Sequence, residues 1–121
     1  MKSACAAKTR TIGTVAVIEL SGDVDGSAAE TLTSACQHAL ADGQASTIVL
    51  DFGAVDYINS TGIALIVSVL ARARAEGRPV AACGLSAHYR EIFDITRLSD
   101  FIELFPDLDD VVSQLKGTAT T

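Results

Sequence analysis

Residues 55–66 read Val55-Asp56-Tyr57-Ile58-Asn59-Ser60-Thr61-Gly62-Ile63-Ala64-Leu65-Ile66, and this stretch decides how the chain folds. Before it, an apolar run ends in Asp51, and after it the sequence stays apolar for several turns of a helix. Asn59, Ser60 and Thr61 carry side-chain oxygens that can accept the free backbone N–H groups of a helix's first turn. The stretch therefore predicts a strand, a short turn and a helix over Thr61 to Glu76.

Ser60 has a second interpretation besides helix capping. It lies at the expected start of a helix, where the dipole and the free N–H groups favour negative charge. A phosphate added to the Ser60 hydroxyl is therefore favoured by its position, and Ser60 is both a capping candidate and a modification candidate.

The composition indicates one domain with an aliphatic core. The 121 residues are about one domain's length, 49% of them are hydrophobic, and Trp is absent. The net charge is −6 and the basic residues are scattered, with only Arg72, Arg74 and Arg78 loosely grouped. Because nucleic-acid binding normally needs a basic patch, we expect no direct contact with nucleic acid.

The cysteine pattern and the lengths of the apolar runs both favour a cytosolic location. Cys5, Cys36 and Cys83 are odd in number and have neither metal-ligand nor redox spacing, as in a reduced cytosolic protein. The first residues lack the apolar run of a signal peptide, and no run approaches the roughly 18 apolar residues of a membrane span. We expect a soluble cytoplasmic protein, without membrane insertion, metal or cofactor.

Strand and helix patterns alternate along the chain. The predicted strands are Thr9–Ile12, Thr14–Leu20, Thr47–Leu50, Pro79–Cys83 and the extended stretch Phe101–Phe105. The predicted helices run from a capping box at Ser27 and Glu30 to about Ala41, then over Thr61–Glu76, Ser86–Asp94 and Leu108–Lys116. Alternation with short connections predicts a single α/β domain over residues 1–121, with an ordered core at about 9–116.

The helix after Ser60 is apolar on more than one face. One stripe, which can bury the helix on a sheet, consists of Ile63, Ile66, Val67, Leu70 and Ala73. A second stripe consists of Thr61, Leu65, Ser68, Val69 and Arg72. Either neighbouring helices cover this second stripe, or Leu65 and Val69 form a docking face for a partner protein beside Ser60.

The chemistry of an enzyme is not indicated. His38 and His88 lie in separate predicted helices, and Ser60 stands in Asn-Ser-Thr-Gly, not in the glycine-flanked turn of a hydrolase nucleophile. We find no metal-ligand cluster, phosphate-binding loop or dinucleotide fingerprint in the sequence. We therefore predict no catalytic residues.

A phosphoacceptor role for Asp51 is a further alternative. Asp51 ends an apolar strand, and Asp23 and Asp25 follow an earlier one, as in receiver domains of response regulators. Such a domain also needs a lysine after a late strand. The lysines here are Lys2, Lys8 and Lys116, which all lie near the chain ends. Asp51 is better interpreted as a turn residue that bonds local N–H groups.

Three segments occur in a fixed order along the chain, and together they form a more specific pattern than any one of them alone. They are residues 17–25, a strand followed by Gly-x-x-Asp; residues 48–62, a strand with Asp51 and then Asp56-Tyr57-Ile58-Asn59-Ser60-Thr61-Gly62; and residues 107–111, the start of a closing helix. Over about residues 9–116 this order resembles the STAS family, which includes the anti-sigma factor antagonists of bacteria. The resemblance implies a mixed four- to five-stranded sheet with about four helices packed mainly on one side.

The resemblance also implies a partner switch. In that family the unphosphorylated protein binds an anti-sigma factor that is itself a serine kinase, which frees the sigma factor. The kinase phosphorylates the motif serine and a serine phosphatase reverses this. Ser60 matches the acceptor, Asp25 matches the acidic residue near it, and Thr61 and Gly62 complete the turn, whereas Asn59 replaces the usual Asp. A monomer or weak dimer is expected.

A role without a serine switch stays open. The alternative is a STAS-like structural subunit of a membrane lipid-transport ATPase complex. The pair Ser60-Thr61 favours the antagonist, and Asn59 is the departure from its motif. An enzyme or a binder of a small ligand ranks third, and a buried pocket with polar groups would favour it.

Overall fold

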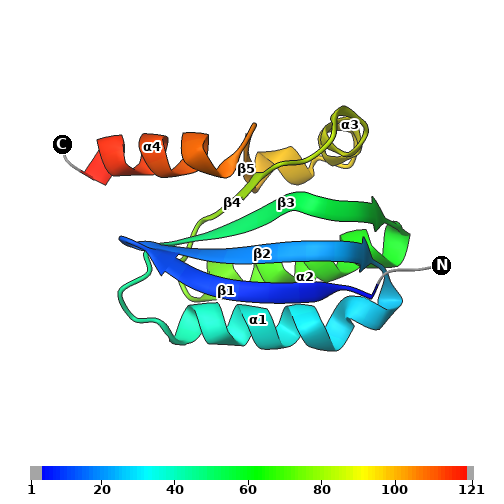
Figure 1. The fold of residues 1–121 in the computed structure, drawn as a ribbon, viewed down its shortest axis with the longest axis horizontal. Helices are drawn as coiled ribbons and strands as arrows, with labels where there is room; N and C mark the ends of the chain where they lie inside the picture. Colours follow the sequence, from blue (N-terminus) through cyan, green and yellow to red (C-terminus); the bar gives the residue numbers. More distant parts are fainter. Residues whose placement is uncertain (1–3, 120–121) are drawn as a thin grey trace.

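A five-stranded mixed sheet forms the centre of the computed structural model, which describes residues 4–119, and their side chains up to Gln114 (Figure 1). The strand order is β1 (Ala6–Ile12), β2 (Val15–Val24), β3 (Thr47–Ile58), β4 (Val80–Cys83) and β5 (Glu103–Phe105). β1 is antiparallel to β2, and the remaining neighbours are parallel. The predicted mixed α/β sheet is confirmed.

Helices cover both faces of this sheet unequally. They are α1 (Ala29–Ala41), α2 (Ser60–Ala75), α3 (Ala87–Ile95) and α4 (Leu108–Ala119), with short 3-10 helices η1 (Gly26–Ala28) and η2 (Leu98–Asp100). Side chains of α1, α2 and α3 share one core with Ile18 and Leu50 of the sheet. On the opposite face, Val111 of α4 packs with Val17 and Val49. The helices therefore lie mainly on one side, as predicted.

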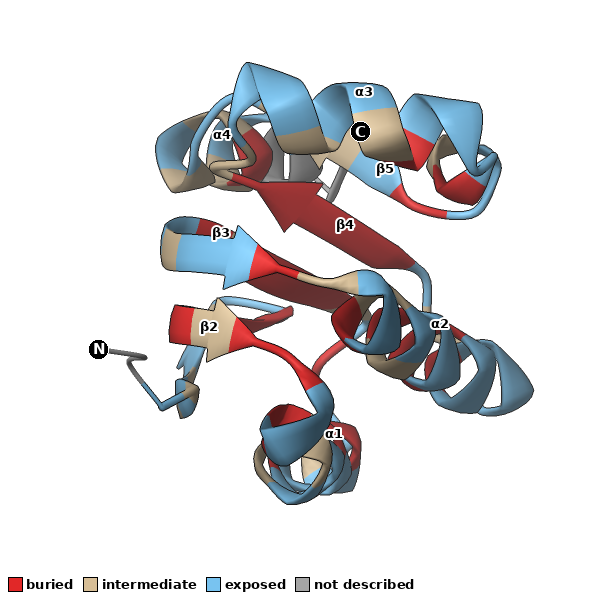
Figure 2. Ribbon diagram, turned by 90° about the vertical axis from the view of Figure 1, so that its right-hand side faces the viewer, coloured by how far each residue is buried: buried red, intermediate tan, exposed pale blue. Residues whose placement is uncertain are grey.

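The central strands are buried because they have a helical layer on each face. Val15, Ala16, Val17 and Ile18 of β2 are all buried, and so is β4 along its whole length (Figure 2). Strands buried on both faces read as continuous apolar runs and not as alternating ones, which matches the sequence of β2. No helix within residues 4–119 is long and apolar enough to cross a bilayer.

The predicted turn after Asp51 is wrong, because β3 continues to Ile58. Its second half pairs with the second half of β2. One shift of register precedes the pair of Val55 with Gly22, and a second lies between that pair and the pair of Ile58 with Val24. Asp51 does accept a local hydrogen bond, from the Gly53 N–H at 2.9 Å. The polar and glycine residues that resemble a turn therefore lie in an irregular strand that carries the chain to Asn59.

Candidate functional site

Asn59 caps α2. Its backbone is extended (φ −99°, ψ −178°), and its side-chain oxygen Oδ1 accepts the Gly62 N–H at 2.8 Å. The Asn59 carbonyl accepts the Ile63 N–H at 2.9 Å, which is the first bond of the helix. Of the three capping candidates, Asn59 is thus the cap, and the helix begins at Ser60, one residue earlier than predicted.

Ser60 is the first helical residue and its side chain is exposed. Within residues 4–114, no hydrogen bond holds its hydroxyl, and the first turn of α2 contains no acidic residue. Thr61, the next residue, is also exposed. The site therefore presents an accessible hydroxyl at the positive end of a 16-residue helix.

Gly62 lies where the start of α2 meets the end of β2. A Cβ at residue 62 would lie 1.9 Å from the carbonyl oxygen of Val24 and 2.8 Å from its carbonyl carbon. The same oxygen accepts the Asn59 N–H at 3.2 Å. Residue 62 therefore has to be glycine, because the backbone of Val24 leaves no room for a Cβ. This contact fixes the start of α2 against the C-terminal end of β2.

Asp25 directly follows Val24 and is 4% exposed. Its Oδ1 accepts the backbone N–H of Ser27 at 3.0 Å and the Ser27 hydroxyl at 2.5 Å. The predicted capping box of Ser27 and Glu30 is therefore wrong: Ser27 donates to Asp25, which caps η1, and α1 begins after Ala28 without a side-chain cap. A buried carboxylate needs such donors, and this satisfies it locally.

The Asp25 turn lies against the first turn of α2. A Cβ on Gly26 would lie 3.5 Å from the Thr61 methyl carbon Cγ2. The Val24 carbonyl also accepts the Asn59 N–H, so the segments of Asp25 and Ser60 lie together at the C-terminal ends of β2 and β3. The predicted motif residues thus gather at one end of β2 and β3, with Ser60 and Thr61 exposed, Asn59 half-buried, and Asp25 and Gly62 buried beneath them.

The two predicted partner residues further along α2 differ in exposure. Val69 is 4% exposed and belongs to the core that α1 covers, so its predicted place on a docking face is wrong. Leu65 is half-buried and lines a cavity of about 260 Å³ between α1 and α2. Helix α1 therefore packs on the second stripe at Val69 and partly at Leu65, whereas Thr61, Ser68 and Arg72 stay exposed.

The first stripe is buried except at Ile63, which is half-buried, and at Val67. Ile66, Leu70 and Ala73 are buried, whereas Val67 is 44% exposed. The expectation that Val67 packs on the sheet is therefore wrong. Val67 instead faces outward on the side toward η2.

Tyr89 is a supporting residue that the sequence does not reveal. Its hydroxyl oxygen, on α3, accepts the Ile58 N–H at 2.9 Å, directly before the cap residue Asn59. Ser86, the predicted cap of α3, accepts the Tyr89 N–H at 3.3 Å. No sequence signal joins Tyr89 to Ile58, because they are 31 residues apart and only the fold brings them together.

No group of three or more metal-ligating side chains occurs in the part of the chain that the structure describes. The chemistry at the α2 terminus is therefore that of a hydroxyl, an amide cap and backbone N–H groups. Such an arrangement suits an anion or an added phosphate.

Comparison with known proteins places this arrangement in a family. The model of the STAS domain matches residues 6–111. A candidate anti-sigma factor antagonist, BtrV of Bordetella bronchiseptica, is 37% identical over 59 residues, which cover 49% of this chain. The match spans about half (48%) of that curated relative.

Solved structures share the fold. An anti-sigma factor antagonist from Mycobacterium paratuberculosis has a TM-score of 0.75 at 24% identity, covering 93% of this chain and 95% of that one. The anti-sigma factor antagonist SpoIIAA in its unphosphorylated form gives 0.72 at 18% identity, with 93% and 99% covered. The phosphorylated form of SpoIIAA from Bacillus gives 0.69 at 19% identity, with 91% and 99% covered. With its sheet order, its helix layers and the turn at Asn59 and Ser60, the chain belongs to the STAS domain family.

Proposed function

We propose that this chain is an anti-sigma factor antagonist that is switched by phosphorylation of Ser60. Its unphosphorylated form binds an anti-sigma factor serine kinase and releases the sigma factor. The observation that carries this proposal is the exposed Ser60 hydroxyl, free of hydrogen bonds to the described residues, at the first position of α2. The kinase adds the phosphate and a serine phosphatase removes it.

The relatives support the regulatory class. BtrV is described as a candidate anti-sigma factor antagonist, and SpoIIAA, which has that role, has been solved in phosphorylated and unphosphorylated forms. We therefore place this protein in the cytoplasm as a binding module and not as an enzyme.

The geometry explains how a phosphate can act without refolding the domain. Phosphoserine adds roughly −1.5 to −2 charges near neutral pH. At a helix N-terminus this charge is stabilised by the dipole and the free N–H groups. On a docking surface the same charge repels acidic groups and must be desolvated. A coupling of ~1–3 kcal/mol, typical between linked sites, changes affinity about 5–150-fold.

Asn59 is compatible with this switch although the usual motif has Asp. As an amide it caps the helix through Oδ1 without adding negative charge next to Ser60. A phosphate on Ser60 therefore meets no carboxylate within the first turn of α2. The nearby buried acid, Asp25, is bonded to Ser27.

The structural-subunit alternative makes a different demand on Ser60. A subunit of a lipid-transport complex needs the fold and a docking face, but no free hydroxyl at the helix start. The accessible Ser60 therefore favours the switch over that alternative.

The test is phosphorylation of the purified protein by each anti-sigma factor kinase encoded in the source genome, with ATP. We expect a mass gain of one phosphate, mapped to Ser60, and none in Ser60→Ala. Ser34→Ala, which removes an exposed hydroxyl on α1 outside the motif, is the matched control and should be phosphorylated like wild type. Ser60→Asp should bind the kinase more weakly than wild type. Phosphate on another residue, or equal affinity of Ser60→Asp, contradicts the proposal.

A further inference from the structure

A groove lies between α2 and the turn that joins α3 to η2. Its volume is about 350 Å³, and its apolar lining comes from Val67, Leu70, Ala71, Leu98 and Phe101. Val67 and Phe101 are 44% and 55% exposed, so apolar surface is open to solvent here. Ile95, which is 71% exposed, directly precedes the lining residue Thr96.

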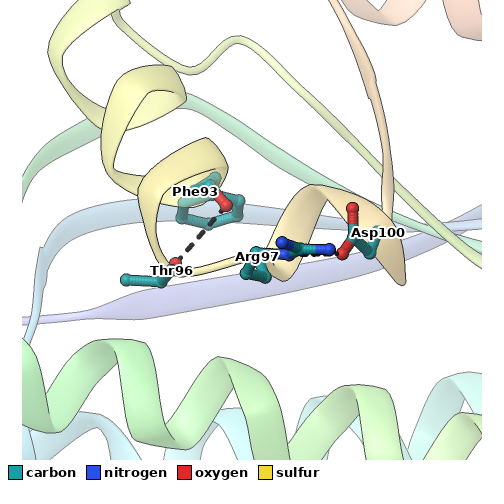
Figure 3. A network of polar contacts seen from close by, with 4 residues as sticks. All are labelled: Phe93, Thr96, Arg97 and Asp100. Carbon is teal, nitrogen blue, oxygen red and sulfur yellow. Dashed lines mark hydrogen bonds and ion pairs between the residues drawn. The ribbon is translucent and has the colours of Figure 1, made fainter.

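The wall opposite α2 is held in shape by the α3–η2 turn (Figure 3). Arg97 adopts a left-handed backbone (φ 65°), and its Nε donates to Asp100 Oδ2 at 2.9 Å. The Thr96 hydroxyl donates to the carbonyls of Ile92 at 2.7 Å and Phe93 at 3.4 Å. Since Phe93 and Leu98 are buried, the turn is anchored on both sides. The groove is therefore formed before any partner arrives, which lowers the entropy lost on docking.

The charges at the groove are opposite in sign to the net charge of the chain. Arg74 and Arg97 are the charged residues that line it, and within the described residues no carboxylate does so. The Arg74 guanidinium lies 5.1 Å from the centre of the Phe101 ring, and Arg97 is paired at the rim with Asp100. Since Asp100 already neutralises Arg97, the cation that the groove offers an acidic group is Arg74, which forms no ion pair within the described residues, in a chain of net charge −6.

An exposed stripe joins this groove to Ser60. Ser60, Ala64, Val67, Ala71 and Arg74 follow one another at alternating spacings of four and three along α2, and all are exposed. Seven residues separate Ser60 from Val67, which is ~10 Å along a helix axis. The bound charge would lie further along, beside Arg74, which is ~21 Å from Ser60 along the axis. That is about two Debye lengths at moderate salt, so a phosphate on Ser60 and a charge beside Arg74 are largely screened from each other.

We propose that this groove docks an acidic amphipathic helix of the anti-sigma partner, with apolar residues between Val67 and Phe101 and carboxylates beside Arg74. The inference rests on the proposed function, since it takes the occupant to be part of that partner. Helix-in-groove docking uses apolar anchors at helical spacing, which an apolar trough between two helical elements accepts.

The first test compares Val67→Glu with Val67→Lys in titration calorimetry against the kinase that phosphorylates Ser60. Val67 is partly exposed, so either side chain fits on the folded domain. We expect both variants to weaken binding, because each places a charge among the apolar contacts of the groove. Val67→Glu should weaken it at least about tenfold more than Val67→Lys, because it also repels the acidic occupant. Gln37→Glu, which adds the same charge on the exposed face of α1, is the matched control and should bind like wild type.

The outcomes separate this inference from the proposed function. If Ser60→Asp weakens binding but neither Val67 variant does, the switch stands and the groove is not part of the interface. Equal weakening by Glu and Lys overturns the acidic occupant. If no anti-sigma factor binds the wild-type protein, the proposed function fails and this inference fails with it. A dimer in sedimentation equilibrium that Val67→Glu dissociates identifies a second copy as the occupant and also overturns it.

The second test identifies the occupant directly. Phe101 is replaced by the photoreactive analogue p-benzoylphenylalanine, and the complex is cross-linked and digested for mass spectrometry. We expect a peptide of the kinase with net negative charge and apolar residues at spacings of three and four. A cross-link to a basic segment, or to another copy of this chain, contradicts the proposal.

Discussion

Gly62 and Val24 approach so closely that a Cβ on Gly62 would lie 1.9 Å from the Val24 carbonyl oxygen. This contact joins the start of α2 to the end of β2 and fixes where the exposed Ser60 stands. The motif glycine therefore has a reason in packing that is independent of phosphorylation.

Gly62→Ala is expected to destabilise the fold. Alanine is the better helix former by about 1 kcal/mol, but the clash with backbone atoms forces a shift of the helix start, and such overpacking costs about 1–3 kcal/mol. The clash outweighs the propensity gain, so the urea midpoint should fall. Gly43→Ala is the control, because nothing lies within 4 Å of its Cβ position, and its midpoint should be unchanged or higher. Equal midpoints for Gly62→Ala and wild type would refute the packing argument.

Asn59→Ala should cost about 1 kcal/mol of unfolding free energy, because it removes the oxygen that accepts the Gly62 N–H. Asn59→Asp restores an acceptor and adds charge at a favourable helix end, so its stability at neutral pH should match or exceed that of wild type. Denaturant unfolding of both variants measures this. An Asn59→Ala protein with the same unfolding free energy as wild type would show that the Asn59 cap does not contribute to stability.

Tyr89→Phe should destabilise the protein by about 1–3 kcal/mol, since the partly buried Ile58 N–H then loses its acceptor. Amide exchange at Ile58 should become faster, whereas exchange at Val49, in the centre of β3, should respond only to the global loss of stability. Unchanged exchange at Ile58 would mean that this hydrogen bond does not hold the strand end.

Stability should fall at alkaline pH partly because of Cys83. Burial, with the neighbouring Asp51 carboxylate, raises the pKa of the Cys83 thiol to about 12 from its model-compound value of 9.0. Between these values the unfolded chain loses the proton while the folded chain keeps it, so unfolding becomes easier as pH rises, by up to about 1.4 kcal/mol per pH unit. Cys83→Ala should show a shallower slope above pH 9.0 than wild type. Identical slopes would show that Cys83 does not titrate on unfolding.

Much of the fold follows from residues whose role is local. The β-branched run of β2, the cap Ser86 and the acidic start of α4, where Asp107 accepts the Asp110 N–H at 2.8 Å, form the elements that their sequence predicts. The motif around Ser60 also predicts its place at a helix start. These features depend on neighbours within a few residues, so the sequence contains the information.

The features that sequence reasoning misses depend on distant partners. Residues after Asp51 have turn-like composition, yet pairing with β2 makes them a strand. Ser27 resembles a helix cap, but its hydroxyl and its backbone N–H both donate hydrogen bonds to the buried Asp25 carboxylate. Val67 and Val69 are equally apolar, and only the position of α1 decides that Val69 is covered and Val67 is not. These contacts join residues that are distant in the sequence, so no local sequence pattern predicts them.

Three hydrogen bonds hold the backbone on both sides of Ser60: Val24 binds the Asn59 N–H, Tyr89 binds the Ile58 N–H, and Asn59 binds the Gly62 N–H. An attached phosphate thus finds its amide donors already oriented and has no segment to reorder. On the proposed function, switching requires no conformational relaxation inside this domain. The rate of switching is then the rate at which the kinase adds the phosphate or the phosphatase removes it. The domain returns to its original state as soon as the phosphate is removed, without a slow conformational step.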